Sequence, residues 1–228
     1  MTLGILYVVG GPIGNLGDVT FRTVETLKGV DFVVSEDTRE TSKLLSHFNI
    51  SKPQISYRDQ NHDYVKDRII ELLMEGKNLA LISDSGTPLI SDPGFKLVIE
   101  ALRDGYKVVS IPGPSALTAS LSISGLPTDK SAFLGFLPKK ERQRRDILIE
   151  YGKLNATLVI FESPNRVKRL LAELFEILGD RVVCITREMT KIHEQVVTNK
   201  LSELLNSSVL IREKGEFVVL VAKEGFKW

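Results

Sequence analysis

The first half of the chain repeats one pattern, and this pattern limits the fold more than any other feature. A short apolar run is followed by a polar or glycine-rich turn and then by a segment with helical periodicity. The apolar runs lie at residues 5–9, 32–34, 79–82 and 108–111. Apolar strands that alternate with helices are typical of a parallel sheet with helices on both faces. We therefore predict an α/β fold whose first domain contains a mostly parallel sheet.

The second half has a different character. Its expected strands, at residues 156–164, 182–188, 193–197 and 216–224, alternate more and are joined by fewer helices. This arrangement is typical of a mixed or largely antiparallel sheet with helices. We place the domain boundary in the Pro-Gly-Pro segment, which gives domains at residues 1–112 and 113–228.

Two helix starts are predicted from local signals in the first domain. Asp18 is a good N-cap, so we expect a helix to begin directly after it. Pro93 suits the first turn of another helix.

Four polar turns follow the apolar runs of the first domain, at residues 10–18, 35–39, 83–94 and 112–116. In parallel α/β sheets ligands bind beyond the carboxyl ends of the strands, where all four turns are expected. The first turn lacks the Gly-x-Gly-x-x-Gly spacing of a dinucleotide loop, and no P-loop Lys-Ser/Thr follows it.

Carboxylates also gather just after the apolar runs, at Asp37, Asp84, Glu162 and Glu188. A cationic ligand, or a hydroxyl group that must lose a proton, would give such a cluster a purpose. For Asp84 the alternative is a turn residue that bonds its own backbone.

Composition excludes several classes of function. Lys and Arg total 30 against 29 Asp and Glu, so any nucleic-acid partner must bind a local patch. Cys184 is the only cysteine, which rules out an intrachain disulfide, and the three histidines show no metal-ligand spacing. The apolar run at residues 5–9 is too short to span a membrane and has no signal-peptide flanks, so we expect a cytoplasmic protein.

A basic segment at residues 139–145 carries five positive charges and one negative charge. Phe133, Phe136 and the stretch Gly135–Pro138 precede it, which is more typical of a presented loop than of a solvated helix face. We predict that this segment contacts phosphates. The predicted RNA-binding residues, with Arg39 added from the second turn, are Arg39, Lys139, Lys140, Arg142, Arg144 and Arg145.

Seven motifs occur in order along the chain. They read YVVGGPIGNLGD, SEDTR, ISDSGTPLISDPG, IPGPSALTASLSISGLPTD, FLGFLPKK, FESPNR and TREMTKIHEQV. Together they strongly resemble the ribosomal RNA small-subunit methyltransferase I family, the cytidine-2′-O-methyltransferases of the tetrapyrrole methylase superfamily. The resemblance runs from about Leu6 to Val221.

The resemblance implies two α/β domains of the tetrapyrrole-methylase type, with S-adenosylmethionine in the cleft between them, and a homodimer. It implies 2′-O-methylation of a cytidine in the decoding region of small-subunit ribosomal RNA, without a metal. Asp84 and Glu162 are the candidates for the catalytic base, and Arg187 is a weaker candidate contributor. The residues that match the family's cofactor motifs are Pro12, Asp84, Gly86, Thr87, Ser115, Ala116, Phe161 and Glu188.

Two positions depart from the family pattern, and two other functions stay open. Gly11 stands where we expect threonine, which would remove one hydrogen bond worth about 1 kcal/mol, and Asn165 stands where we expect histidine. One alternative is a methyltransferase for a corrin or porphyrin ring. The other is an RNA-binding ribosome assembly factor without catalysis.

Overall fold

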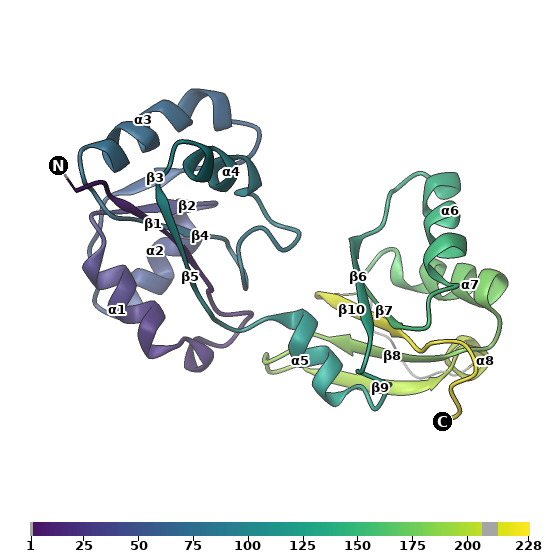
Figure 1. Ribbon diagram of the computed structural model, residues 1–228. Coiled ribbons are helices and arrows are strands. Elements are labelled where there is room, and N and C mark those ends of the chain that lie inside the picture. Colours follow the sequence, from purple (N-terminus) through teal and green to yellow (C-terminus); the bar gives the residue numbers. More distant parts are fainter. Residues whose placement is uncertain (1, 207–213) are drawn as a thin grey trace. The chain divides into compact units, whose positions relative to one another are not determined.

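The structure, a computed structural model, describes residues 2–206 and 214–228. Its internal contacts divide the chain into two compact units, residues 1–115 and 116–228, so the division falls after residue 115 rather than after residue 112. Each unit has a sheet and helices of its own (Figure 1). Within the described part of the chain, no helix is long and apolar enough to cross a bilayer.

The first unit is built on a five-stranded parallel sheet with the order β3-β2-β4-β1-β5. This confirms the predicted parallel sheet. The sequence missed β3, a three-residue edge strand without an apolar run. The strands are β1 (Ile5–Val9), β2 (Phe32–Ser35), β3 (Gln54–Ser56), β4 (Leu79–Ile82) and β5 (Lys107–Ile111).

Helices cover both faces of this sheet. Adjacent residues of a strand point to opposite faces, so a strand that is apolar throughout needs cover on both. Leu81 packs in one apolar cluster with Ile69 of α3 and Leu97 of α4. Ile82 packs in the other cluster with Leu27 of α1 and with the buried leucines of α2. Every residue of β4 is buried, which explains its unbroken apolar run. The helices are α1 (Phe21–Gly29), α2 (Thr38–His47), α3 (His62–Met74) and α4 (Phe95–Arg103), and a short 3-10 helix spans Leu16–Asp18.

Both predicted helix starts in this unit were wrong by a few residues. Helix α1 is capped by Thr20, whose side chain accepts a hydrogen bond from the Thr23 N–H, and Asp18 belongs to the preceding 3-10 helix. Helix α4 is preceded by Gly94, so Pro93 lies before the helix rather than in its first turn.

The second unit is built on a mixed sheet, as predicted, with five strands in the order β6-β7-β10-β8-β9. Strand β6 was not among the four strands expected in this half, because its residues were expected to form a loop. Strands β6 and β7 are parallel, and the other neighbours are antiparallel. The strands are β6 (Ser131–Phe136), β7 (Thr157–Glu162), β8 (Val182–Arg187), β9 (Gln195–Lys200) and β10 (Phe217–Val221).

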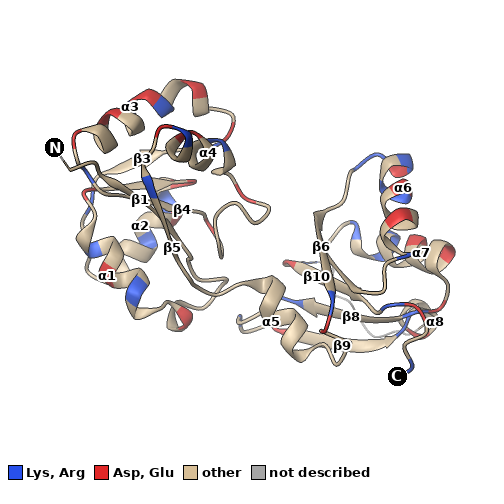
Figure 2. Ribbon diagram, viewed as in Figure 1, with Lys and Arg blue, Asp and Glu red and all other residues tan. Residues whose placement is uncertain are grey.

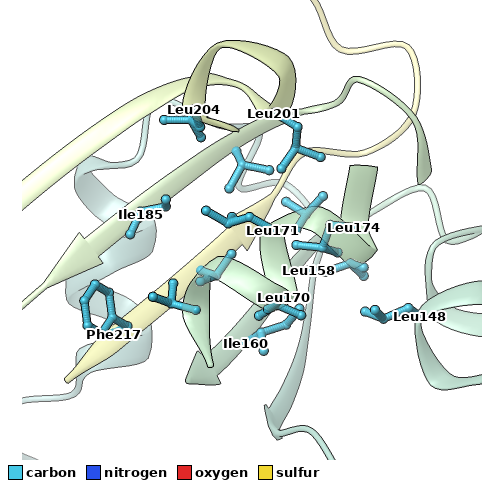
Figure 3. Packing of buried hydrophobic residues seen from close by; sticks show 14 of the residues in the cluster. Leu148, Leu158, Ile160, Leu170, Leu171, Leu174, Ile185, Leu201, Leu204 and Phe217 are labelled. Atoms are coloured by element: carbon cyan, nitrogen blue, oxygen red, sulfur yellow. The ribbon is translucent and has the colours of Figure 1, made fainter. Parts of the chain in front are cut away.

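Two clusters of apolar side chains cover this second sheet. Leu148, Leu170 and Leu201 from α6, α7 and α8 pack on one face in the larger cluster (Figure 3). Leu117 and Leu121 from α5 pack on the other face. The helices are α5 (Ala116–Ile123), α6 (Glu141–Tyr151), α7 (Val167–Leu178) and α8 (Leu201–Asn206).

Candidate active site

The carboxyl end of β4 is the place where the connections of the first unit diverge. Strands β1 and β2 flank β4, and the helices that follow them pack on the face opposite α3 and α4. The chain therefore leaves β4 toward one face and leaves its two neighbours toward the other. In open α/β sheets, ligands bind beyond the strand ends at such a point. The predicted residues Pro12, Asp84, Gly86 and Thr87 lie on these diverging segments.

Backbone hydrogen bonds join the segments after β1 and β4. The Gly11 N–H donates to the Gly86 carbonyl at 2.7 Å, and the Gly86 N–H donates to the Pro12 carbonyl at 3.0 Å. Gly86 has a φ of +71°, which favours glycine. A β-carbon at Gly11 would lie 3.6 Å from Ile82 Cδ1, an ordinary contact distance, so this position has room for a β-carbon.

A second close approach joins the segments after β1 and β5, and the sequence did not reveal it. A β-carbon on Gly10 would lie 2.7 Å from the Gly113 nitrogen, and one on Gly113 would lie 2.7 Å from the Gly10 carbonyl oxygen. Both positions therefore require glycine. The Gly10 N–H donates to the Ile111 carbonyl at 2.9 Å, and the Thr23 hydroxyl donates to the Gly10 carbonyl at 3.1 Å. Ser115, also predicted, lies two residues beyond Gly113 in the chain.

Three carboxylates meet where β2 and β4 end. Asp84 Oδ1 accepts a hydrogen bond from the Asp37 N–H at 3.0 Å, and Glu36 Oε2 accepts one from the Asp84 N–H at 3.2 Å. Arg39 bonds both carboxylate oxygens of Asp37, at 3.0 and 2.6 Å, while Arg58 lies 3.6 Å from Asp37. Sequence reasoning missed Glu36, although it directly precedes Asp37 in the same motif.

The carboxyl groups of this cluster differ in their tendency to ionise. Burial raises the pKa of Asp84, and the negative charge of Asp37 adds to this effect. Burial also raises the pKa of Glu36, with a further contribution from the charge of Asp84. Hydrogen bonds from Arg39 hold the pKa of Asp37 well below its usual range. In Asp84 and Glu36, hydrogen bonds and the charge of Arg58 therefore compensate the ionised form only in part.

The segment after Asp84 stores backbone strain. Leu89 and Ser91 have φ values of +74° and +66°, which bulky or branched residues seldom adopt. The Gly94 N–H donates to Asp59 Oδ1 at 3.1 Å and thereby ties the segment to the residues after β3. Such strained backbone clusters at ligand-binding segments. Thr87 lies at its start and is partly buried.

In the second unit, β6, β7 and β8 end at one edge of the sheet. Glu162 and Arg187 both pair with Phe217 of β10, from opposite sides. The predicted residues Phe161, Glu162 and Glu188 therefore lie at this edge. Ala116 is the first residue of α5. It is partly buried against the apolar cluster on the α5 face of the sheet, which is the face opposite α6 and α7.

Glu162 is a buried carboxylate with an incomplete set of partners. Its side chain is 1% exposed, and Oε1 accepts hydrogen bonds from the Ser163 N–H at 2.7 Å and the Ser163 hydroxyl at 3.3 Å. The Arg166 guanidinium lies 3.3 Å from the same oxygen. Oε2 is buried and has no hydrogen-bond partner among the described residues. A buried polar atom without a partner is uncommon and suits an oxygen that meets a ligand or a proton.

The charged side chains at the end of β8 have more hydrogen-bond partners than Glu162. Glu188 Oε1 accepts hydrogen bonds from Lys191 Nζ and from the Glu216 N–H, each at 3.0 Å. The buried Arg187 guanidinium donates to the Lys214 and His193 carbonyls. These bonds give Arg187 a structural role in holding the segments around β8.

The basic segment forms the loop before α6 and its first turns, where basic residues gather in Figure 2. Arg144 was predicted to bind RNA, but in the structure its guanidinium is buried and paired within the unit. Its side chain is 2% exposed, it forms an ion pair with Glu173 at 2.5 Å, and it donates to the Pro138 and Lys139 carbonyls. Arg145 pairs with Glu176 at 2.8 Å, although it stays partly exposed.

Three other cations of the segment remain available. Lys139, Lys140 and Arg142 are exposed, and they form no ion pair with any residue that the structure describes. Arg39, in the first unit, is 85% exposed while it bonds Asp37. Across residues 2–206 and 214–228, no group of three or more His, Cys, Asp or Glu side chains could hold a metal ion.

Comparison with known proteins defines the class. The sequence profile of the tetrapyrrole (corrin/porphyrin) methylases matches residues 5–205. A crystal structure of diphthine synthase superposes with a TM-score of 0.71 at 18% identity, covering 96% of this chain and 89% of that one. A cobalt precorrin-4 methyltransferase superposes with a TM-score of 0.67 at 16% identity, covering 96% and 94%. The chain is thus a methyltransferase with the tetrapyrrole methylase fold.

Curated relatives narrow the assignment. Ribosomal RNA small subunit methyltransferase I from Halalkalibacterium halodurans is 46% identical, covering 98% of this chain and 78% of the relative. The protein of the same name from Thermotoga maritima is 45% identical, covering 97% of this chain and all of the relative. The chain belongs to the ribosomal RNA small subunit methyltransferase I family, as its seven motifs indicated.

Proposed function

We propose that this protein transfers a methyl group from S-adenosylmethionine to the 2′-hydroxyl of a cytidine in the decoding region of small-subunit (16S) ribosomal RNA. The names of its relatives support the RNA substrate. The structural observation that carries the proposal is the divergence of segments around β4, with the carboxylates of Asp84 and Glu36 at this point.

The residues of the first unit fit a sulfonium cation. Gly10 and Gly113 bring two backbone segments together without side chains, which suits the close approach of a ligand to the backbone. Asp84 and Glu36 have raised pKa values, and a nearby positive charge would favour their ionised forms. The residues proposed to hold the cofactor are Pro12, Asp84, Gly86, Thr87, Ser115, Ala116, Phe161 and Glu188.

S-adenosylmethionine would supply an electrophilic methyl carbon on a sulfonium centre, whose leaving group is a neutral thioether. The protein's part is first to align the ribose oxygen with this carbon, an effect worth roughly 7–11 kcal/mol. A carboxylate that accepts the hydroxyl proton adds about 10²–10⁴-fold. Asp84 suits this role through its raised pKa, and Glu162 suits it through the unpartnered Oε2.

The side chains favour a ribose oxygen over a base carbon as the methyl acceptor. Methylation of a base carbon commonly uses a cysteine thiolate to activate the ring. Cys184 is fully buried in β8, and burial raises the pKa of its thiol, so the thiolate is disfavoured. A 2′-hydroxyl needs only alignment and a proton acceptor.

The RNA partner is proposed to meet the second unit at its exposed cations. Lys139, Lys140 and Arg142 can neutralise phosphates without breaking an existing ion pair, and Arg145 can contribute when it leaves Glu176. We also propose a homodimer, which sedimentation at micromolar concentration would test. RNA is favoured over a corrin or porphyrin acceptor because the names of the relatives specify ribosomal RNA.

The experiment is methyl transfer from labelled S-adenosylmethionine to unmodified small ribosomal subunits and to naked 16S RNA. A methyl group on the 2′-oxygen blocks alkaline cleavage at that nucleotide. We therefore expect one labelled, alkali-resistant dinucleotide that begins with cytidine.

A labelled base with an alkali-labile linkage would contradict the proposed chemistry. Labelling of a corrin or porphyrin but not of RNA would favour the alternative substrate. RNA binding without any transfer would favour the assembly-factor alternative.

A further inference from the structure

Strand β6 contains a bulge that changes the direction of its last aromatic side chain. Phe133 pairs with Val159, but Gly135 already pairs with Ile160, so the register shifts between them. Gly135 has a φ of +60°, as glycine does in many bulges. In a regular strand, Phe133 and Phe136 would point to opposite faces, because they are three residues apart.

Because of the bulge, both phenylalanines contact Phe161. The ring centroids of Phe133 and Phe161 are 4.9 Å apart, and those of Phe136 and Phe161 are 5.7 Å apart, each pair in an edge-to-face arrangement. Phe133 and Phe161 are partly buried against the apolar cluster that α5 contributes to. Phe136 is 58% exposed, although Phe161 holds its ring in place. The bulge thus presents an aromatic ring to solvent at the strand end.

The backbone that follows Phe136 is held by two arginines. Arg166 Nη2 donates to the Leu137 carbonyl at 2.9 Å. Arg144 Nη1 donates to the Pro138 and Lys139 carbonyls, each at 3.0 Å. Since Arg144 is itself buried and paired with Glu173, these bonds fix the loop to the body of the unit. Lys139 and Lys140 therefore extend into solvent from an ordered backbone, close in sequence to the exposed ring.

We propose that Phe136 stacks on a base of the RNA substrate while Lys139 and Lys140 bind the flanking phosphates. This inference rests on the proposed function and names a residue that selects single-stranded RNA at the same site. Proteins that bind single strands combine aromatic rings for the bases with cations for the backbone, and rings held in advance lose little entropy. A single exposed phenylalanine is common and does not by itself indicate a binding site. Here the ring is presented by a bulge, contacts Phe161 and lies close in sequence to exposed cations.

The first test separates base contacts from phosphate contacts. Phe136→Leu should weaken binding of an oligocytidylate by about 5- to 140-fold, the range found for loss of one base–aromatic stack. Binding of an abasic oligonucleotide of equal length should not change. Lys139→Gln with Lys140→Gln should weaken both. The matched control is Phe175→Leu on α7, where the phenylalanine is 39% exposed and belongs to a different element.

The second test uses fluorescence. Trp228 is the only tryptophan, so Phe136→Trp in a Trp228→Phe background carries a single emitting ring at the proposed contact. We expect the oligocytidylate to quench this emission and the abasic oligonucleotide to leave it unchanged. Phe136→Trp should also retain the RNA affinity that Phe136→Leu loses. The KM for small ribosomal subunits should rise in Phe136→Leu, with little change in kcat or in cofactor affinity.

Unchanged oligocytidylate affinity in Phe136→Leu, or unquenched emission from Phe136→Trp with RNA bound, would overturn the inference. A change in sedimentation instead of RNA affinity would assign Phe136 to a contact between copies of the chain and would also overturn it. If the unmodified protein neither binds nor methylates RNA, the proposed function itself fails, and this outcome is distinct from the others.

Discussion

The raised pKa of Asp84 has opposite consequences for stability and for catalysis: it lowers the stability of the folded protein at neutral pH but suits a proton acceptor. Its carboxyl group has a raised pKa, mainly because of burial and also because of the adjacent charge of Asp37. The folded state therefore binds this proton more tightly than the unfolded state. The free energy of unfolding rises as pH falls through the window between the raised pKa and the ordinary value. At pH 7 the ionised carboxylate is slightly destabilising, since Asp84 is exposed and solvent screens its charge.

Asp84→Asn tests this at the scale of one residue. The variant should melt at a higher temperature than the parent protein at pH 7, and the difference should shrink as pH falls through that window. If Asp84 accepts the ribose proton, methyl transfer should fall about 10²- to 10⁴-fold. The rise in rate with pH should also flatten.

Asp37→Asn is the control, because Arg39 lowers the pKa of Asp37 and its stabilisation is present above the ordinary value and lost at low pH. Its effect on stability at pH 7 should have the opposite sign and be small, since the Arg39 side chain is exposed to solvent. If Asp84→Asn lowers the melting temperature and leaves the rate unchanged, Asp84 is only a turn residue.

At the scale of the element, the geometry of α6 places some residues of the basic segment on its buried face and others on its exposed face. Arg144 and Leu148 are four residues apart and both buried, so they share the face that packs on α7. Arg142 lies on the solvent side. The Arg144 side chain is bidentate with Glu173, and this hydrogen bonding lowers the pKa of Glu173. One helix thus carries a structural arginine and a surface arginine two residues apart.

Arg142→Met and Arg144→Met form a matched pair of variants. Arg144→Met should lower the free energy of unfolding by about 3 kcal/mol, the low end of the cost of breaking a buried ion pair, because Arg169 Nε still bonds Glu173 Oε1 at 3.0 Å. Arg142→Met should leave unfolding unchanged but weaken RNA binding and lower its salt slope by about 0.9 or less. Urea unfolding and salt-dependent RNA titration measure the two effects.

The double variant Arg144→Met with Glu173→Leu should recover much of the lost stability, since apolar side chains can replace a buried ion pair. Equal stability of Arg142→Met and Arg144→Met would contradict the assignment of Arg144 to the core.

At the scale of the whole molecule, each unit has a sheet, covering helices and apolar clusters of its own. A ligand that binds only the folded protein raises its stability by mass action, whatever the details of its site. The methyl-donor product S-adenosylhomocysteine is therefore a probe of the proposed cofactor that requires no RNA.

S-adenosylhomocysteine at 100 times its Kd should stabilise the protein by about 2.7 kcal/mol. For a chain of this length, the melting temperature should rise by about 5–10 °C. NAD is the control, because the first glycine-rich turn lacks the dinucleotide spacing and should not bind it. Stabilisation by NAD alone would contradict the proposed cofactor.

Much of the fold followed from the sequence because its signals are local. The apolar runs at residues 79–82 and 108–111 mark strands that are buried between helices, and a turn must follow each strand at the same edge. Asp84, Gly86 and Pro12 could therefore be assigned to one edge, and the seven collinear motifs indicated the family. Short edge strands such as β3 carry too few residues to give a signal of this kind.

Contacts between distant residues were decided only by the tertiary structure. The sequence cannot distinguish the buried Arg144 from the exposed Arg142, because burial depends on Glu173, 29 residues away. The contact of Gly10 with Gly113 and the bulge that places Phe136 beside Phe161 also require partners far along the chain. Local patterns determine which residues enter strands and turns, whereas long-range packing determines which side chains remain free to meet a ligand.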